Sequence, residues 1–166
     1  MWFSMKKVLY RVVLPLMIFC LLVLISSNYF LIAFNTTASL EGTVFLIDKT
    51  TRPKRGDIAA FSPPTGNLNT GQRGYLSTSP FLKIAMGVAN DQVIMTDMGV
   101  FINGAYVGPI HTETATGTAL VTTKSGLVPN KHYFMGSTHA GSYDSRYASI
   151  GYIPESRVMG RAIRLY

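Results

Sequence analysis

Cysteine is almost missing from the sequence: Cys20 is the one cysteine in 166 residues, and it lies inside an apolar run. This excludes an intramolecular disulfide, and it also excludes a thiolate zinc site or a cysteine nucleophile after the run. Histidine is scarce as well. His111, His132 and His139 are well separated and match no HExxH-type spacing, so we expect neither a metal site nor a cofactor.

Charge is also sparse. Charged residues make up 14% of the chain and hydrophobic residues 48%, whereas roughly a quarter of the residues in soluble domains are charged. The formal net charge is +7, and part of it lies at the N-terminus. The remaining positive charge is scattered and forms no basic stripe with interleaved aromatics, so we expect no nucleic-acid partner.

Residues 12–34 contain no charged residue and no histidine. Because about 20 apolar residues are enough to cross the core of a bilayer, this run predicts a single transmembrane helix and a lipid bilayer as partner. Lys6, Lys7 and Arg11 lie just before the run. By the positive-inside rule, these cations favour a cytoplasmic N-terminus.

The chain is therefore predicted to have three segments: a cytoplasmic N-terminus at 1–11, a transmembrane anchor at 12–34 and an extracytoplasmic β-rich domain at 35–166. A cleaved leader is the alternative, because Thr36 and Ala38 are small residues at the spacing of a cleavage site. We expect a retained anchor, since the run is longer than the roughly 7–15 apolar residues of a leader.

Beyond residue 35, short β-rich segments alternate with turn residues, and no helical periodicity is present. Asn103-Gly104 is typical of a two-residue hairpin loop. Residues 62–80 and 108–130 are rich in turn-forming residues and predict long loops. The predicted fold class is mostly β, with an N-terminal single transmembrane helix followed by a small antiparallel β domain. The expected strands are 43–48, 57–61, 81–88, 92–98, 100–107, 132–137 and 158–166.

Lys83 lies within an apolar segment, residues 80–86. In a strand it would share one face with Phe81 and Ala85. Two environments remain open for this lysine. Its stem can run to a strand edge with the amine in solvent, or the amine can be buried, which lowers its pKa and makes it a candidate general base.

Two other groups of polar residues are candidates for chemistry. Residues 35–42, directly after the apolar run, are rich in hydroxyl groups, which is also ordinary for a linker or turn. His139 lies close in sequence to Ser142 and Asp144, which leaves a Ser-His-Asp triad as an alternative. A single histidine in a loop is more often a solvated polar residue.

Three sequence blocks occur in one order along the chain. The first is Thr37-Ala38-Ser39-Leu40. The second comprises Arg73–Leu76, Pro80–Lys83 and Asn90–Val93, and the third comprises Gly141–Tyr147, Gly151–Pro154 and Val158–Ala162. Together they resemble the type I signal peptidase superfamily, and most closely its conjugative-transfer branch, the TraF-type peptidases that mature pilin precursors.

The resemblance implies a Ser/Lys dyad that uses no histidine and no metal. Ser39 matches the nucleophile and Lys83 matches the general base. Thr37 matches a residue whose hydroxyl joins the Ser39 N–H in the oxyanion hole. Ser142 matches a serine that orients the lysine.

The resemblance also implies a structural ion pair near the site, between Asp144 and Arg146. Three positions depart from the family pattern. Glu41 stands where proline is frequent, Ile84 where arginine is frequent, and Asn90 where the family has glycine. None of these changes removes a reacting group, but each affects what can be inferred about loop shape and the substrate groove.

The function implied by the resemblance is that of a membrane-anchored serine endopeptidase. Its expected partner is a membrane-anchored, pilin-like precursor peptide, cleaved after a small residue. The implied location is the bacterial inner membrane, single-pass, with the catalytic domain in the periplasm. Hydrolysis and cyclisation of the product both remain open. The alternative is a non-enzymatic, membrane-tethered β scaffold of an envelope or secretion assembly, in which Ser39 and Lys83 are only structural.

Overall fold

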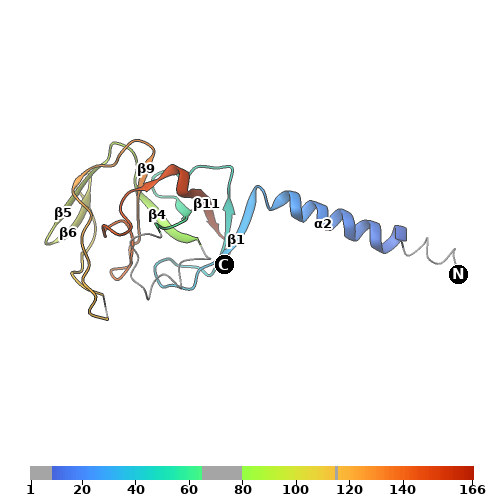
Figure 1. The fold of residues 1–166 in the computed structure, drawn as a ribbon, viewed down its shortest axis with the longest axis horizontal. Coiled ribbons are helices and arrows are strands. Elements are labelled where there is room, and N and C mark those ends of the chain that lie inside the picture. Colours follow the sequence, from blue (N-terminus) through green and yellow to red (C-terminus); the bar gives the residue numbers. More distant parts are fainter. Residues whose placement is uncertain (1–8, 65–79, 115) are drawn as a thin grey trace.

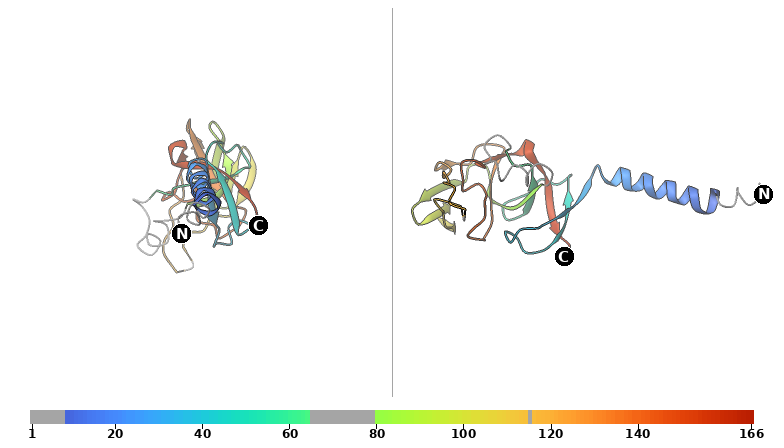
Figure 2. Two further views of the ribbon diagram at one scale, coloured as in Figure 1. Left: turned by 90° about the vertical axis from the view of Figure 1, so that its right-hand side faces the viewer. Right: turned by 60° about the horizontal axis from the view of Figure 1, so that its bottom comes forward.

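The structure, a computed structural model, describes residues 9–64, 80–114 and 116–166. A helical segment projects from a domain built of two antiparallel sheets (Figure 1). The right-hand view of Figure 2 also shows the helix pointing away from the domain, and the left-hand view looks nearly along the helix. The prediction of a mostly β, antiparallel fold is confirmed.

The apolar run is divided between a helix and a strand. A π-helical turn, η1 (Leu9–Val13), leads into α2 (Leu14–Ser26). The chain then turns at residues 27–29, and β1 (Phe30–Phe34) pairs with β2 (Val44–Asp48). The expectation of one helix over 12–34 is therefore wrong for residues 30–34, where aromatic and branched residues find a strand partner.

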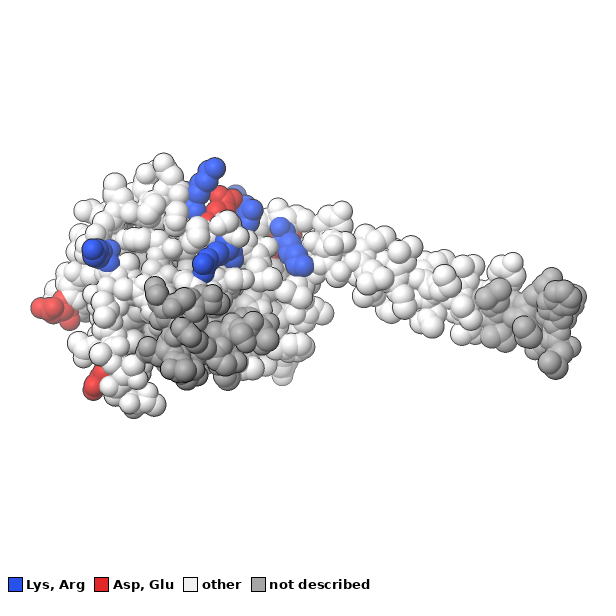
Figure 3. Space-filling view, in the orientation of Figure 1, with Lys and Arg blue, Asp and Glu red and all other residues white. Residues whose placement is uncertain are grey.

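No side chain of α2 is buried, and its surface carries no charged group (Figure 3). Among the helices of the described residues, none combines the length and the apolar character needed to cross a membrane.

The larger sheet has seven strands in the order β1-β2-β11-β3-β4-β9-β10. All of its neighbours pair antiparallel. The strands after β2 are β3 (Ile58–Phe61), β4 (Phe81–Gly87), β9 (His132–Gly136), β10 (Ile153–Pro154) and β11 (Val158–Arg164). A short 3-10 turn, η2 (Glu155–Arg157), separates β10 from β11. Thus β11 joins the pair β1-β2 to the strands β3, β4, β9 and β10.

The smaller sheet has the order β7-β6-β5-β8. Its strands are β5 (Gln92–Thr96), β6 (Gly99–Ile102), β7 (Ala105–Gly108) and β8 (Gly126–Leu127). The β6–β7 hairpin turns at Asn103-Gly104, whose φ values of 51° and 81° suit a type I′ turn. β8 lies inside the predicted loop 108–130. Of the predicted loop 62–80, residues 65–79 lie outside the described residues, as do Arg73–Leu76 of the second sequence block.

Successive side chains of the central strands β3 and β4 point to opposite faces of the sheet and belong to two separate hydrophobic clusters. On β3, Ala59 belongs to one cluster, together with Ala85 of β4, and Ala60 belongs to the cluster on the opposite face, together with Leu82 of β4. Lys83 pairs with Ala59 in the β3–β4 register. The lysine is thereby directed to the face of Ala59 and Ala85.

Candidate active site

Lys83 is a buried lysine in the middle of the larger sheet. Lys83 is 6% exposed. Of the two environments left open by the sequence, the buried amine is therefore the one found, and the solvated amine at a strand edge is excluded. Phe81 and Ala85, from the same strand, belong to the hydrophobic cluster on that face. The amine lies 6.0 Å from the centre of the Phe81 ring and donates a hydrogen bond of 2.8 Å to the Ser142 hydroxyl.

Burial lowers the pKa of Lys83 from 10.5 to about 8. The main cause is loss of water around the charged form. The negative charge of Asp144 opposes the decrease, and the positive charge of Arg146 adds to it. A substantial fraction of this amine is therefore neutral at mildly alkaline pH, where it has a lone pair available to accept a proton.

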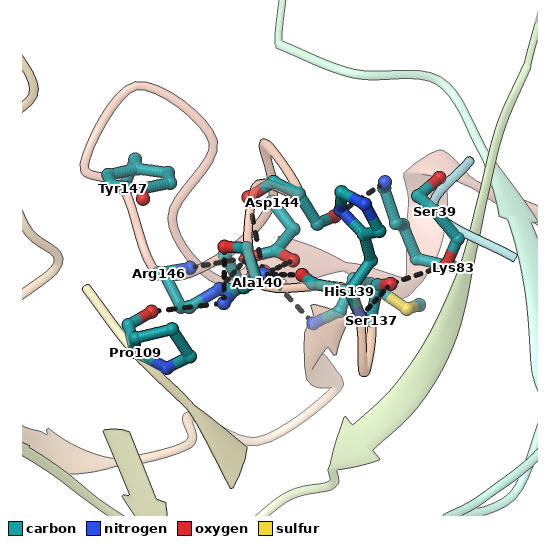
Figure 4. A network of polar contacts seen from close by, with 12 residues as sticks. Ser39, Lys83, Pro109, Ser137, His139, Ala140, Asp144, Arg146 and Tyr147 are labelled. Atoms are coloured by element: carbon teal, nitrogen blue, oxygen red, sulfur yellow. Dashed lines mark hydrogen bonds and ion pairs between the residues drawn. The ribbon is translucent and has the colours of Figure 1, made fainter. Parts of the chain in front are cut away.

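Asp144 and Arg146 form a fully buried ion pair. Arg146 Nε donates to one carboxylate oxygen of Asp144 and Nη2 to the other, both at 2.8 Å, and the two side chains are 0% and 1% exposed. Arg146 also donates to the carbonyls of His139, Ala140 and Ser142. Figure 4 shows Arg146 beside His139 and Ala140. The guanidinium therefore holds the loop whose Ser142 hydroxyl accepts the hydrogen bond from Lys83.

Ser39 lies in the turn that follows β1 and is 8% exposed. Its hydroxyl oxygen is 2.8 Å from the Thr37 hydroxyl oxygen. The turn is closed by Asn35, whose side-chain amide binds backbone groups on both sides of Ser39. Gly42 ends the turn with φ 103°, and a Cβ there would lie 2.5 Å from the Arg164 side chain, so glycine is required at this position.

The turn of Ser39 is bound to the residue that follows β9, the neighbour of β4 in the larger sheet. Ile84 of β4 pairs with Gly136, the last residue of β9; Lys83 precedes Ile84 and Ser137 follows Gly136 in the chain. The Ser137 hydroxyl donates a hydrogen bond to the carbonyl of Ser39. In Figure 4 the side chains of Ser39 and Lys83 accordingly lie at the same end of the polar network.

The arrangement disfavours a triad built on His139. Both carboxylate oxygens of Asp144 bind Arg146, and the Ser142 hydroxyl accepts from Lys83. His139 is exposed and contributes its backbone N–H to the Ser137 hydroxyl. Within the described ranges, no group of three His, Cys, Asp or Glu side chains comes together where a metal ion could be held.

Ser137 has a clear place in the site but was not among the candidates predicted from the sequence, and Asn35 was included only as part of the segment 35–42, with no role of its own. Ser137 is 1% exposed and lies 98 positions from its partner Ser39. No local pattern signals a bond over that separation. Asn35 does carry a signal that could have found it, because asparagine directly after a strand and before hydroxyl residues is a common turn former.

A buried lysine with a lowered pKa that is hydrogen-bonded to a serine, as Lys83 is to Ser142, is typical of a serine-peptidase-like hydrolase with a lysine base. The comparison with known families agrees. Residues 5–166 match the family described as signal peptidase, peptidase S26, and the chain belongs to that family.

Relatives among curated proteins carry names from conjugation. A conjugal transfer protein TraF from Agrobacterium tumefaciens (strain 15955) is 31% identical over 141 residues, which cover 77% of this chain and 78% of the relative. A probable conjugal transfer protein TraF from Sinorhizobium fredii is 30% identical over 142 residues, covering 77% of this chain and 73% of the relative.

Among solved structures, a signal peptidase I from Enterococcus faecalis V583 aligns with a TM-score of 0.41 at 21% sequence identity. The alignment covers 67% of this chain and 97% of that chain.

Proposed function

We propose that the protein is a membrane-associated serine endopeptidase in which Ser39 is the nucleophile and Lys83 is the general base. The observation that carries the proposal is the buried Lys83 amine, held by Ser142 and with its pKa lowered to about 8. A serine hydroxyl is a weak nucleophile until a neighbouring base accepts its proton, and a desolvated lysine is such a base.

In the proposed acylation step, the neutral Lys83 Nζ accepts the Ser39 hydroxyl proton as Ser39 Oγ forms a bond to the scissile carbonyl carbon. The oxyanion is stabilised by the Ser39 N–H and the Thr37 hydroxyl; losing one such donor typically costs about 100- to 1,000-fold in rate. The carbon–nitrogen bond then breaks, and protonated Lys83 gives its proton to the leaving amine. Ser142 and the Asp144–Arg146 pair hold the lysine in place.

In the second step an acceptor resolves the ester on Ser39. Water gives a linear product, with Lys83 accepting its proton, whereas an amine of the same peptide gives a cyclic product. The substrate we propose is a membrane-anchored precursor, pilin-like in view of the TraF relatives, cleaved after a small residue. It would add as an extended strand to an exposed sheet edge.

We further propose that the chain is held at a bacterial inner membrane through its exposed apolar α2 segment, with a cytoplasmic N-terminus and a periplasmic catalytic domain. Every described side chain of α2 is exposed and apolar or uncharged, and such a surface is stabilised by lipid. β1 follows α2 after the turn at residues 27–29, and Ser39 lies in the turn after β1, so a membrane-bound α2 would keep the site close to the bilayer surface, where a membrane-anchored precursor presents its cleavage junction.

The direct test uses a membrane-anchored precursor pilin as the proposed substrate, co-expressed with the wild type or with Ser39→Ala. We expect processing by the wild type and none by Ser39→Ala, because removal of the hydroxyl removes the acyl-enzyme. Mass spectrometry of the mature product then separates the two outcomes of the second step, since a cyclic product is one water lighter than a linear one. Normal processing by a folded Ser39→Ala protein would instead favour the non-enzymatic scaffold.

The pH dependence of cleavage provides an independent test. Because only neutral Lys83 accepts the proton and its pKa is about 8, kcat/KM should rise about tenfold per pH unit below pH 8 and level off above it. Thr37→Val is the control: it should lower the plateau without moving the midpoint. A midpoint near that of an ordinary histidine, abolished in His139→Ala, would contradict the role of Lys83.

A further inference from the structure

Asn35 makes an unusually dense set of hydrogen bonds around the turn that carries Ser39. Its Nδ2 donates to the carbonyls of Thr37 at 2.9 Å, Leu40 at 2.9 Å and Gly42 at 3.1 Å. Its Oδ1 accepts from the Thr37 N–H at 3.2 Å and from the Thr37 hydroxyl at 3.0 Å. One side chain thus links backbone groups before and after the proposed nucleophile.

The partners determine which way the Asn35 amide faces. The three carbonyl oxygens can only accept and the Thr37 N–H can only donate, so Nδ2 and Oδ1 cannot be exchanged without losing every one of these bonds. Asn35 is itself tied to the sheet, because its own N–H donates to the Thr43 carbonyl at 2.9 Å. The amide is therefore a fixed point at the end of β1.

This orientation also determines the direction of the hydroxyl chain. Asn35 Oδ1 has no proton and can only accept, so the Thr37 hydroxyl donates its single proton in the hydrogen bond to Asn35. The 2.8 Å contact between the Thr37 and Ser39 hydroxyls must then use the proton of Ser39. In the resting site, Ser39 donates to Thr37 and Thr37 donates to Asn35. During the proposed attack the Ser39 proton passes to Lys83, and the Thr37 hydroxyl turns its proton from Asn35 to the oxyanion.

We propose that Asn35 is a positioning residue for the reaction: it fixes the Ser39 side chain through the Thr37 hydroxyl and shapes the turn through the three carbonyls. This inference rests on the proposed function, since it assumes that Ser39 is the nucleophile. Asn35 contacts no reacting atom of its own. Asn35 affects catalysis indirectly, because it determines how accurately Ser39 Oγ is positioned for attack.

The test measures kcat and KM for Asn35→Ala, Thr37→Val and the double variant with a synthetic precursor peptide in detergent micelles. Misplacing a reacting group by about 1 Å costs on the order of 100-fold in rate, so we expect Asn35→Ala to lower kcat by about that factor. For Asn35→Ala we expect an unchanged KM. We also expect an unchanged pH midpoint, because the substitution leaves the surroundings of Lys83 as they are.

In the Thr37→Val background, Asn35→Ala should lower kcat by a markedly smaller factor, because the Thr37 hydroxyl that links Asn35 to Ser39 is already absent. Equal losses of kcat in both backgrounds would overturn the inference, as would a kcat within twofold of the wild type. Asn35→Ser is the second variant if Asn35→Ala does not fold. Its oxygen can still accept the Thr37 N–H, but it has no amide to bind the three carbonyls.

Asn103→Gly is the matched control. Asn103 also binds backbone and side-chain groups in a turn, and its φ of 51° suits glycine. This variant should lower thermal stability and leave kcat unchanged. Ser39→Ala, assayed in parallel, separates the two hypotheses: activity in Ser39→Ala removes the proposed function itself, whereas an inactive Ser39→Ala with a fully active Asn35→Ala removes the positioning role alone.

Discussion

Replacing Lys83 by alanine is expected to lower the rate of precursor cleavage by about 10⁴-fold or more, the scale seen when a nucleophile–base pair is broken. Without the amine, no neighbouring group accepts the Ser39 proton at neutral pH. Lys83→Arg should be equally inactive, because a guanidinium stays protonated at any workable pH. The measurement is single-turnover cleavage of precursor peptide by the full-length protein in detergent micelles.

Lys83→Met separates this chemical loss from a loss of folding. The pKa of Lys83 in the folded protein, about 8, lies below its ordinary value of 10.5, so burial of the charged amine destabilises the wild type. That penalty is complete below pH 8 and disappears as the pH rises to 10.5. Lys83→Met should therefore be inactive yet more stable by about 2 kcal/mol at pH 7, after the lost bond to Ser142 is counted.

The gain in stability should shrink between pH 8 and 10.5, as the wild-type lysine becomes neutral in both states. Urea unfolding at a series of pH values measures it. A Lys83→Met protein that cleaves precursor, or one whose free energy of unfolding relative to the wild type does not change with pH, would contradict a buried, titrating base at this position.

Arg146→Met is expected to have the largest effect on stability, lowering the free energy of unfolding by about 3–5 kcal/mol. The substitution leaves the carboxylate of Asp144 buried with no counter-charge, since both side chains of the pair are essentially inaccessible to solvent. It also removes the donors that hold the carbonyls of His139 and Ser142. Denaturant unfolding of the full chain measures the loss.

The Arg164–Glu41 pair provides the matched control. Its side chains are 54% and 94% exposed, and Arg164→Met should cost no more than about 1 kcal/mol. Adding Asp144→Asn to Arg146→Met should restore part of the lost stability, because the unpaired buried charge is removed. If Arg146→Met and Arg164→Met lower the free energy of unfolding by the same amount, the buried Asp144–Arg146 pair does not stabilise the loop of Ser142 in the way described.

Strands whose signals are local were predictable from the sequence. The alternation of Phe81, Lys83 and Ala85 against Leu82 matches the two clusters on opposite faces of β4. Asn103-Gly104 adopts positive φ at both positions, as the hairpin signal requires. In each case the side chains themselves carry the information, through period-two burial or through the backbone freedom of a turn residue.

Features that depend on distant partners were not predictable. Residues 30–34 are as apolar as the helix before them, and they form a strand because the edge of β2 is available to them. Strands β8 and β10 are two residues long and carry no periodicity at all. Whether Lys83 was buried or solvated depended likewise on strands and loops that pack over it from far along the chain.

The place of β11 in the larger sheet makes the proposed dyad depend on a strand that carries neither of its residues. A nascent chain that has emerged only through β10 already contains Ser39 and Lys83, but it lacks the strand that joins β2 to β3. Without β11, the pair β1-β2, which precedes and follows the turn of Ser39, is no longer joined within the sheet to β3 and β4. We therefore expect the proposed peptidase activity to be absent from a nascent chain until residues 158–164 are available to complete the sheet.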